Sequence, residues 1–396
     1  MRINRLSFVG PLALAAAMLA PRDAQAIPAW ARKYNMNCSG CHSPAVPRLN
    51  AKGFAFKWAG YRMPEEIGEN QEVKQISEYL AARFNFQYVW AKTESQSADA
   101  NSLALGQAAI FAGGPIGKNY GGFLELAHSS EGVEVVSNLY GVWGKEKEYG
   151  GVRVGQFHWL FEGGVAGFDR ATGLNGPTPL ENPLTTAAPF AFGARQVGGE
   201  VFYVKDKNRL SFEVFNGVNA AGMGDGAGSP DRKDFAAIDQ LIYDANGSGL
   251  MAVAYFGSVD GLDTALTKTS HFNRFALSAN KIVNGFEVMG GYAYAKDNDL
   301  PVGAMFTTRS VTGNGFWGYA GYTFPSSSLT TFGRYEYINS NKDIANSGNT
   351  RYVLGGVLPV SLPEYLRLAA EYTLDKPRET SGLKRHGLTL EVALAF

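Results

Sequence analysis

The stretch Leu388-Thr389-Leu390-Glu391-Val392-Ala393-Leu394-Ala395-Phe396 alternates between large apolar side chains and polar or small ones. A period of two residues predicts a β-strand whose two faces meet different surroundings. One face of this strand is wholly apolar, and the other carries a glutamate at its centre. A soluble sandwich buries the apolar face, whereas a membrane barrel turns it outward to lipid and turns the polar face inward.

The same period of two recurs from about residue 79 to the end of the chain. Clear examples are residues 82–90, 209–214 and 366–374, in which Arg83, Arg209 and Arg367 occupy the polar face. About sixteen such segments can be counted. Their centres lie near residues 85, 107, 123, 139, 154, 200, 212, 239, 253, 277, 289, 319, 333, 354, 369 and 391.

The connections between these segments alternate in length. Every second connection is a short turn, as at residues 115–117, 205–208, 245–248, 281–284 and 325–327, and most of the others are longer and polar. This alternation along an even number of strands is typical of bacterial outer-membrane barrels. The sequence therefore predicts an all-β fold for residues 79–396, an antiparallel barrel of about sixteen strands. Both termini are expected in the periplasm and the long loops outside the cell.

Composition agrees with a barrel in lipid. Formal net charge is zero, which argues against nucleic acid as a partner. Charged residues make up 18% of the chain, below the usual quarter of a soluble domain, while aromatic residues reach 13% and glycine counts 48. Low charge with abundant aromatic residues is expected of a β-protein whose outer face meets membrane lipid.

Residues 1–26 have the features of a secretory signal peptide. Arg2 and Arg5 precede an apolar run over residues 6–20, and Ala24-Gln25-Ala26 fits a cleavage site. The mature chain is expected to begin at Ile27. Export from the cytoplasm is required for an outer-membrane location.

The motif Cys38-Ser39-Gly40-Cys41-His42 contains the only two cysteines of the 396 residues. This spacing is the attachment pattern of c-type haem, in which both thiols bind the haem covalently and the histidine binds its iron. A zinc site would need two further ligands, for which no second Cys or His pair of suitable spacing exists. A thioredoxin-like motif would need a βαβ unit, and a disulfide at this spacing would close too short a loop to stabilise the chain much. One covalent haem c on Cys38 and Cys41, with His42 as proximal ligand, is therefore expected.

Residues 27–78 form a separate unit around this motif. Within residues 47–61, Leu49, Phe56 and Ala59 recur at helical spacing, as do Phe54 and Trp58. We expect a short helix packed on the haem, although an ordinary amphipathic helix gives the same pattern. About fifty residues bury little core alone, so this mainly α domain is predicted to plug or cap the lumen of the barrel.

The sequence from Ile27 to Pro64, followed by a barrel that ends in Phe396, resembles the fused monohaem cytochrome–porins of iron-oxidising bacteria. The shared segments are residues 28–32 (Pro-Ala-Trp-Ala-Arg), the haem motif, residues 47–50 (Pro-Arg-Leu-Asn) and residues 56–61 (Phe-Lys-Trp-Ala-Gly-Tyr). They cover about a tenth of the chain. The resemblance implies electron transfer from extracellular Fe(II), through the haem, to a periplasmic c-type cytochrome.

The distal ligand of the haem iron is open from the sequence. Met63 follows the predicted helix and is the candidate, since a thioether raises the reduction potential. Met36 is so near Cys38 that reaching the distal side would strain the chain. An open or water-bound site, or a loop residue, is the remaining alternative.

Histidines and carboxylates near the predicted outer loops offer ligands for Fe(II), although polar loops usually only face solvent. They are His128, His158, His271, His386, Glu131, Glu162, Asp260, Asp263, Asp297, Asp299 and Asp375. Three functions compete: inward electron transfer from Fe(II), outward transfer to extracellular acceptors, and a diffusion porin with a structural or sensory haem. The first would make the protein an Fe(II)-oxidising cytochrome. Phosphate loops and hydrolase motifs are absent from the sequence.

Overall fold

The computed structural model describes residues 28–42, 48–72, 74–95, 99–129, 132–158, 173–185, 191–192, 195–217, 233–260, 269–302, 307–361, 365–378 and 383–396. The expected signal peptide, residues 1–26, lies outside the described residues. None of the helices in the described ranges is long and apolar enough to cross a membrane.

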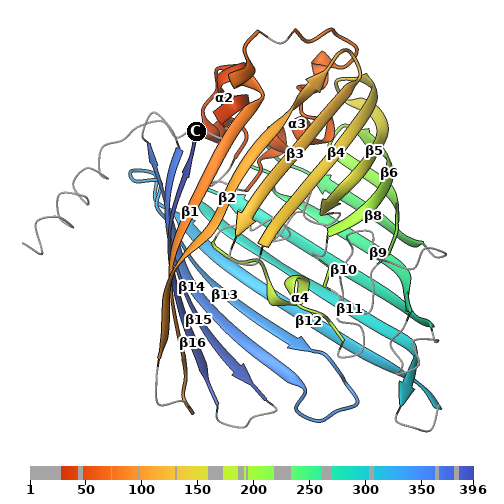
Figure 1. The fold of residues 1–396 in the computed structure, drawn as a ribbon, viewed down its shortest axis with the longest axis vertical. Coiled ribbons are helices and arrows are strands. Elements are labelled where there is room, and N and C mark those ends of the chain that lie inside the picture. The colour runs from red at the N-terminus through yellow and green to blue at the C-terminus, as the bar shows by residue number, and fades with distance from the viewer. Residues whose placement is uncertain are drawn as a thin grey trace, which may run out of the picture.

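Sixteen antiparallel strands form one closed barrel, in which each strand pairs with its neighbours in the chain and β1 pairs with β16 (Figure 1). Closure leaves no sheet edge, so the strands pair with one another all the way around the wall. The strands are β1 Leu80–Thr93, β2 Ala100–Ile116, β3 Tyr120–Ser129, β4 Gly132–Lys145, β5 Glu148–His158, β6 Arg195–Lys205, β7 Asn208–Phe215, β8 Asp234–Ile242, β9 Gly249–Asp260, β10 Thr269–Val283, β11 Phe286–Val302, β12 Thr307–Thr323, β13 Thr330–Asn339, β14 Gly348–Ser361, β15 Tyr365–Pro377 and β16 Arg385–Ala395.

The predicted strand count is confirmed, and each of the sixteen predicted centres falls inside its strand. Two predicted turns were misplaced. Strand β10 continues to Val283, so the turn is Asn284-Gly285, whose φ angles of 50° and 81° allow a two-residue reversal. Strand β2 continues to Ile116, and its turn therefore begins at Gly117.

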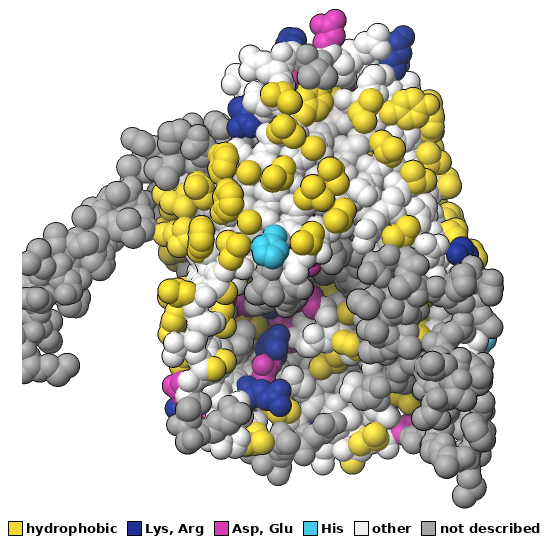
Figure 2. Space-filling model, viewed as in Figure 1, with side chains coloured by type: hydrophobic (Ala, Val, Ile, Leu, Met, Phe, Trp, Pro, Cys, Tyr) yellow, Lys and Arg dark blue, Asp and Glu magenta, His cyan; other side chains and the backbone are white. Residues whose placement is uncertain are grey.

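The two faces of the wall differ as predicted. Large apolar side chains such as Leu103, Phe212 and Leu354 are exposed on the outside, whereas Glu391 and Arg367 are buried inside. Hydrophobic side chains are scattered over the strands in Figure 2, and charged ones gather at the rims and in the hollow of the lower half. This is the polarity of a barrel that faces lipid.

Buried ion pairs join nearby strands along the inner face of the wall. On strands β5, β6 and β7, Arg153 lies 2.7 Å from Glu200, which also pairs with Arg209. Arg153 further lies 3.5 Å from Glu213. Such pairs add little net stability, but removing one partner leaves a buried charge at a cost of about 3–5 kcal/mol.

A helical segment, which comprises residues 28–42, 48–72 and 74–78, lies at the barrel end that carries the short turns and the C-terminus (Figure 1). Its buried aromatic side chains, Phe54, Phe56 and Trp58, join one apolar core with inward-facing wall residues. It contains α2 Pro28–Tyr34, η2 Cys38–Gly40, α3 Ala51–Trp58, η3 Pro64–Glu66 and η4 Ile76–Glu78. We call this end of the barrel the short-turn mouth.

Candidate functional site

The Cys38–His42 motif forms a single helical turn at η2. The carbonyl oxygen of Cys38 accepts hydrogen bonds from the backbone N–H groups of Cys41, at 3.0 Å, and His42, at 2.8 Å. Residues three and four positions apart on a helical turn lie on the same side. The turn therefore presents both thiols and the imidazole to one side, as attachment of one planar group requires.

A second segment, Arg48–Asn50, holds this turn in place. The Asn50 side-chain N–H₂ donates to the carbonyl oxygens of Ser39, at 3.1 Å, and Gly40, at 3.2 Å, and the Asn50 backbone N–H donates to Cys41 at 2.9 Å. The Asn50 side-chain oxygen accepts from Gly53 N–H and so caps α3. One asparagine thus fixes the motif against the start of the helix.

Gly53 permits the close approach of α3 to the motif. A Cβ at this position would overlap the carbonyl oxygen of Cys41 and lie 2.9 Å from Leu49 Cδ2. Glycine costs about 1 kcal/mol in a helix interior relative to alanine. Here that cost is offset because only a residue without a side chain fits against the turn.

The contacts of His42 select its tautomer. Its Nδ1 lies 3.1 Å from the carbonyl oxygen of Arg48, and a carbonyl only accepts hydrogen bonds. The proton of the neutral ring is therefore assigned to Nδ1, which leaves Nε2 as the unprotonated ring nitrogen. Histidines that bind metals typically donate their other N–H to a carbonyl or carboxylate in this way.

Cys38 and Cys41 form no disulfide, and burial raises the pKa of both thiols. A raised pKa disfavours the thiolate that zinc and redox chemistry need. Within the described ranges, no group of three or more His, Cys, Asp or Glu residues could hold a metal ion. Covalent haem c on Cys38 and Cys41 stays a prediction from the spacing of the motif.

The site is attached to the barrel wall on the side of β8, β9 and β11. Arg48 Nε lies 2.6 Å from Oε1 of Glu287 on β11, and both side chains are buried, at 5% and 0% exposure. Ala51 N–H donates to the carbonyl oxygen of Ala245 in the β8–β9 turn. A Cβ at Gly247, which has φ of 84°, would approach Leu49 O to 2.5 Å.

A second attachment lies on the side of β2, β3 and β4. The buried Arg62 guanidinium donates to three backbone carbonyls of the β2–β3 turn, those of residues 117, 118 and 120. The Tyr61 ring stacks on the rings of Trp30 and of Phe123 in β3, with ring centroids 5.2 Å and 5.3 Å apart. The backbone of Gly60 touches that of Gly121, where any Cβ would overlap it. The helical segment is thus held to two separate arcs of the wall.

Met63 lies with the second attachment. It is buried in the apolar core, and its backbone N–H donates to Glu66, which also accepts from Tyr34. The contacts of His42, in contrast, lead to the β8–β11 arc. Met36 is nearer the motif, because a Cβ at Gly40 would lie 3.6 Å from its sulfur. The role of Met63 as distal ligand stays a prediction.

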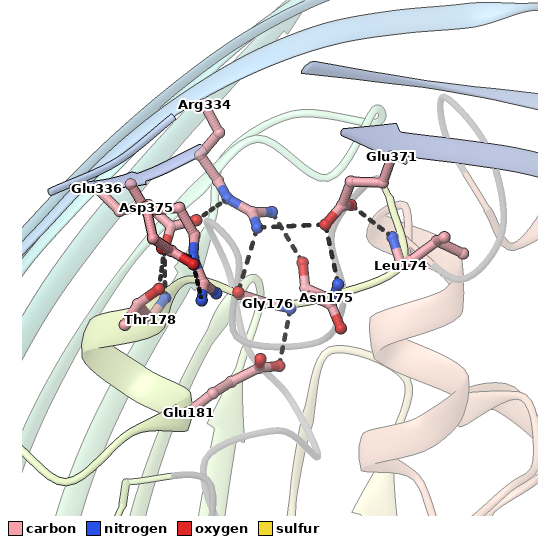
Figure 3. Close-up of polar contacts among 10 residues, drawn as sticks. Leu174, Asn175, Gly176, Thr178, Glu181, Arg334, Glu336, Glu371 and Asp375 are labelled. Carbon is pink, nitrogen blue, oxygen red and sulfur yellow. Dashed lines mark hydrogen bonds and ion pairs between the residues drawn. The ribbon is translucent and has the colours of Figure 1, made fainter. Parts of the chain in front are cut away.

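A second feature of the lumen was not predicted from the sequence. Residues 173–185, which belong to the long β5–β6 connection, fold into the barrel and carry the short helix α4 Thr178–Glu181 (Figure 1). Wall carboxylates hold them there, as Figure 3 shows: Glu371 accepts from Leu174 N–H at 2.9 Å, and Glu336 accepts from Thr178 N–H at 2.8 Å. Arg334 lies between these two carboxylates. We call residues 173–185 the lumen loop.

The expected outer-loop ligands do not gather into a metal site in the described ranges. His128 lies near the end of β3, and His271 and His386 lie near the starts of β10 and β16. Four of the acids belong to strands: Asp260 to β9, Asp297 and Asp299 to β11, and Asp375 to β15. Asp297 pairs with Arg274, and Asp375 pairs with Arg351 at 2.6 Å. Outside the described residues lie the positions or side chains of His158, Glu131, Glu162, Asp260, Asp263 and Asp299.

Solved structures share the barrel fold. They include an anion-selective porin from Comamonas acidovorans (TM-score 0.54, 10% identity, covering 80% of this chain and 98% of that one). The outer membrane channel DcaP of Acinetobacter baumannii matches with TM-score 0.57 at 12% identity, covering 80% and 96%. Salmonella typhi OmpF, in a complex with daunomycin, matches with TM-score 0.56 at 14% identity, covering 80% and 97%.

No protein-family model and no curated protein sequence matches this chain. At these identities the structural similarity establishes the fold: the chain is a closed, porin-like barrel of sixteen antiparallel strands.

Proposed function

We propose that this chain is an outer-membrane electron-transfer protein, with one haem c bound covalently by Cys38 and Cys41 and axially by His42. The observation that carries the proposal is the geometry of the motif. Its turn is fixed by Asn50, its imidazole is oriented by the Arg48 carbonyl, and it lies in the short-turn mouth of a porin-like barrel.

The proposed orientation follows the pattern of outer-membrane barrels, with short turns and both termini in the periplasm and long loops outside. Covalent haem attachment also takes place outside the cytoplasm, in agreement with the signal peptide predicted for residues 1–26. Extracellular Fe(II) as donor and a periplasmic c-type cytochrome as acceptor rest on the family resemblance. Outward transfer to an extracellular acceptor uses the same parts in reverse.

Bound at this site, haem c would supply a centre that gains and loses one electron. Cys38 and Cys41 would fix it covalently, and His42 would orient it through an imidazole whose Nδ1–H is held by Arg48. The buried rings of Phe54 and Trp58 keep water from the inner side of the helical segment. Because a bilayer core is about 30 Å thick, a single centre in the mouth needs a donor that enters from the loop side.

A diffusion porin is the second candidate, because the structural neighbours include a porin and a channel. Two obstructions weigh against an open channel: the helical segment in the short-turn mouth and the lumen loop. A diffusion porin with this structure would have to let solutes pass beside both the helical segment and the lumen loop.

The test is a purification of the full chain in detergent after expression with a haem-attachment system. A pyridine haemochrome spectrum and the mass of the intact protein measure covalent haem, with Cys38→Ala and Cys41→Ala as controls. Fe(II) is then added without oxygen at near-neutral pH, while the haem α-band is recorded.

Rapid reduction by Fe(II) supports inward electron transfer. Reduction by dithionite but not by Fe(II) excludes iron oxidation and leaves outward transfer or a haem-bearing porin. A chain without covalent haem overturns the proposal, and solute uptake by liposomes that contain the protein then supports the diffusion porin.

A further inference from the structure

The ion pair between Arg48 and Glu287 joins the haem motif to the barrel wall. We propose that Glu287 is a positioning residue: through Arg48 it fixes the carbonyl that orients His42, and so sets the reduction potential of the haem iron. This inference rests on the proposed function and concerns the same site. It assigns a role to a strand residue far from the motif in the sequence.

Two contacts of Arg48 carry the inference. Its guanidinium Nε lies 2.6 Å from Glu287 Oε1, and its carbonyl oxygen lies 3.1 Å from His42 Nδ1. Both belong to one residue, so anchoring the side chain limits where the carbonyl can lie. The two charged side chains are 5% and 0% exposed, which removes most of the screening that weakens surface pairs.

The neighbouring backbone is held to the same arc of the wall. Leu49 forms an isolated antiparallel bridge with His42, and Ala51 N–H donates to Ala245 at 3.3 Å. Arg48–Ala51 therefore lies between the motif on one side and the wall on the other. Glu287, on strand β11, supplies the charged contact between Arg48 and the wall.

The chemistry gives the expected direction. A hydrogen bond from Nδ1–H makes a histidine a more basic ligand, which favours ferric iron and lowers the reduction potential. A displaced Arg48 carbonyl weakens this bond and raises the potential. Removing the Glu287 charge also leaves the Arg48 cation uncompensated, which favours the reduced iron and acts in the same direction.

Two variants separate position from charge. Glu287→Gln removes the charge and the pairing, whereas Arg48→Lys keeps both formal charges but replaces the planar fork by a single ammonium group. The control is Glu391→Gln, because Glu391 is also a buried wall carboxylate paired with an arginine, Arg367 of β15, but lies on β16. Heat-modifiable migration in gels measures barrel folding, and the pyridine haemochrome measures haem content.

The decisive measurements on the holoprotein are the midpoint potential and the iron–histidine stretching band in Raman spectra after photodissociation of carbon monoxide. Both Glu287→Gln and Arg48→Lys should raise the potential and lower the band frequency at wild-type haem content, while Glu391→Gln changes neither. Wild-type values in both variants overturn the inference alone. If Glu287→Gln does not fold, Arg48→Lys decides. A wild type without covalent haem overturns the proposed function and this inference together.

Discussion

Replacing Gly53 by alanine tests how the motif is held. On helix propensity alone, alanine would stabilise α3 by about 1 kcal/mol. Its Cβ, however, would lie less than 3.0 Å from both Cys41 O and Leu49 Cδ2, so the motif must move away. That movement strains the three hydrogen bonds from Asn50 to residues 39–41.

The magnitude follows from these contacts. Three hydrogen bonds at about 1 kcal/mol each, less about 1 kcal/mol of helix propensity, leave a net loss of about 2 kcal/mol. At about 1.4 kcal/mol per tenfold change, the population of the undocked helical segment rises about 30-fold. Trypsin cleavage at Lys52 and Lys57, followed by mass spectrometry of the protein in detergent, measures this population when opening is fast relative to cleavage.

The matched control is Gly40→Ala, because a Cβ there makes only ordinary contacts of 3.6 Å with Met36. It should leave the cleavage rate and the haem content unchanged. Cleavage of Gly53→Ala at the wild-type rate would refute the reasoning. It would mean that the added Cβ fits beside Cys41 and Leu49 without moving the motif.

Three further predictions concern the motif and the lumen loop. In the haem-free protein, iodoacetamide should alkylate both cysteines at pH 8 more slowly than free cysteine, and Cys38 most slowly. Because burial raises both pKa values, the alkylation rates should increase with pH. Alkylation rates that do not depend on pH would contradict this prediction. Asn50→Ala removes a helix cap worth about 1 kcal/mol, so trypsin should cleave the helical segment about fivefold faster or more; an unchanged rate would show that the cap is dispensable. Glu371→Gln replaces a charged acceptor by a neutral one, so the Leu174 amide should exchange with deuterium about fivefold faster or more. Mass spectrometry of the peptide that contains the lumen loop measures this exchange. Equal exchange in the variant and the wild type would mean that other contacts hold the loop.

The barrel was predictable because lipid and lumen impose opposite demands on alternate residues. Leu210, Phe212 and Val214 face outward along β7, and Arg209 and Glu213 face inward, so the period of two is plain in the sequence. Near the ends of the strands, the inward and outward side chains differ less in polarity. A turn was predicted at residues 281–284, but Lys281 lies on the exposed face of β10, close to the end of the strand.

The spacing of the motif predicts its chemistry, but not its supports. Asn50 and Gly53 are ordinary residues in the sequence, and their roles appear only when α3 lies against the turn. Glu287 looks like any inward carboxylate of a barrel strand. Long-range partners of this kind depend on the closed wall, which no local pattern describes.

The lumen loop escaped prediction for a similar reason. Its apolar residues, such as Leu180 and Leu184, show no period, and the carboxylates that bind it lie on distant strands. A long polar connection predicts an exposed loop by default. Here Glu336 and Glu371 satisfy its backbone N–H groups inside the barrel, which makes the inward path stable.

The two attachments of the helical segment also set an order of maturation. The segment precedes the barrel strands in the chain, whereas its anchors, Gly121 on β3 and Glu287 on β11, come much later. The surface on which the helical segment docks does not form until those strands are in place. The long sequence separation therefore makes docking a late step of folding. Under the proposed function, buried Cys38 would be most accessible to an attachment enzyme before then. The position of the motif ahead of the barrel would thus leave an interval for haem attachment before the segment docks against the wall.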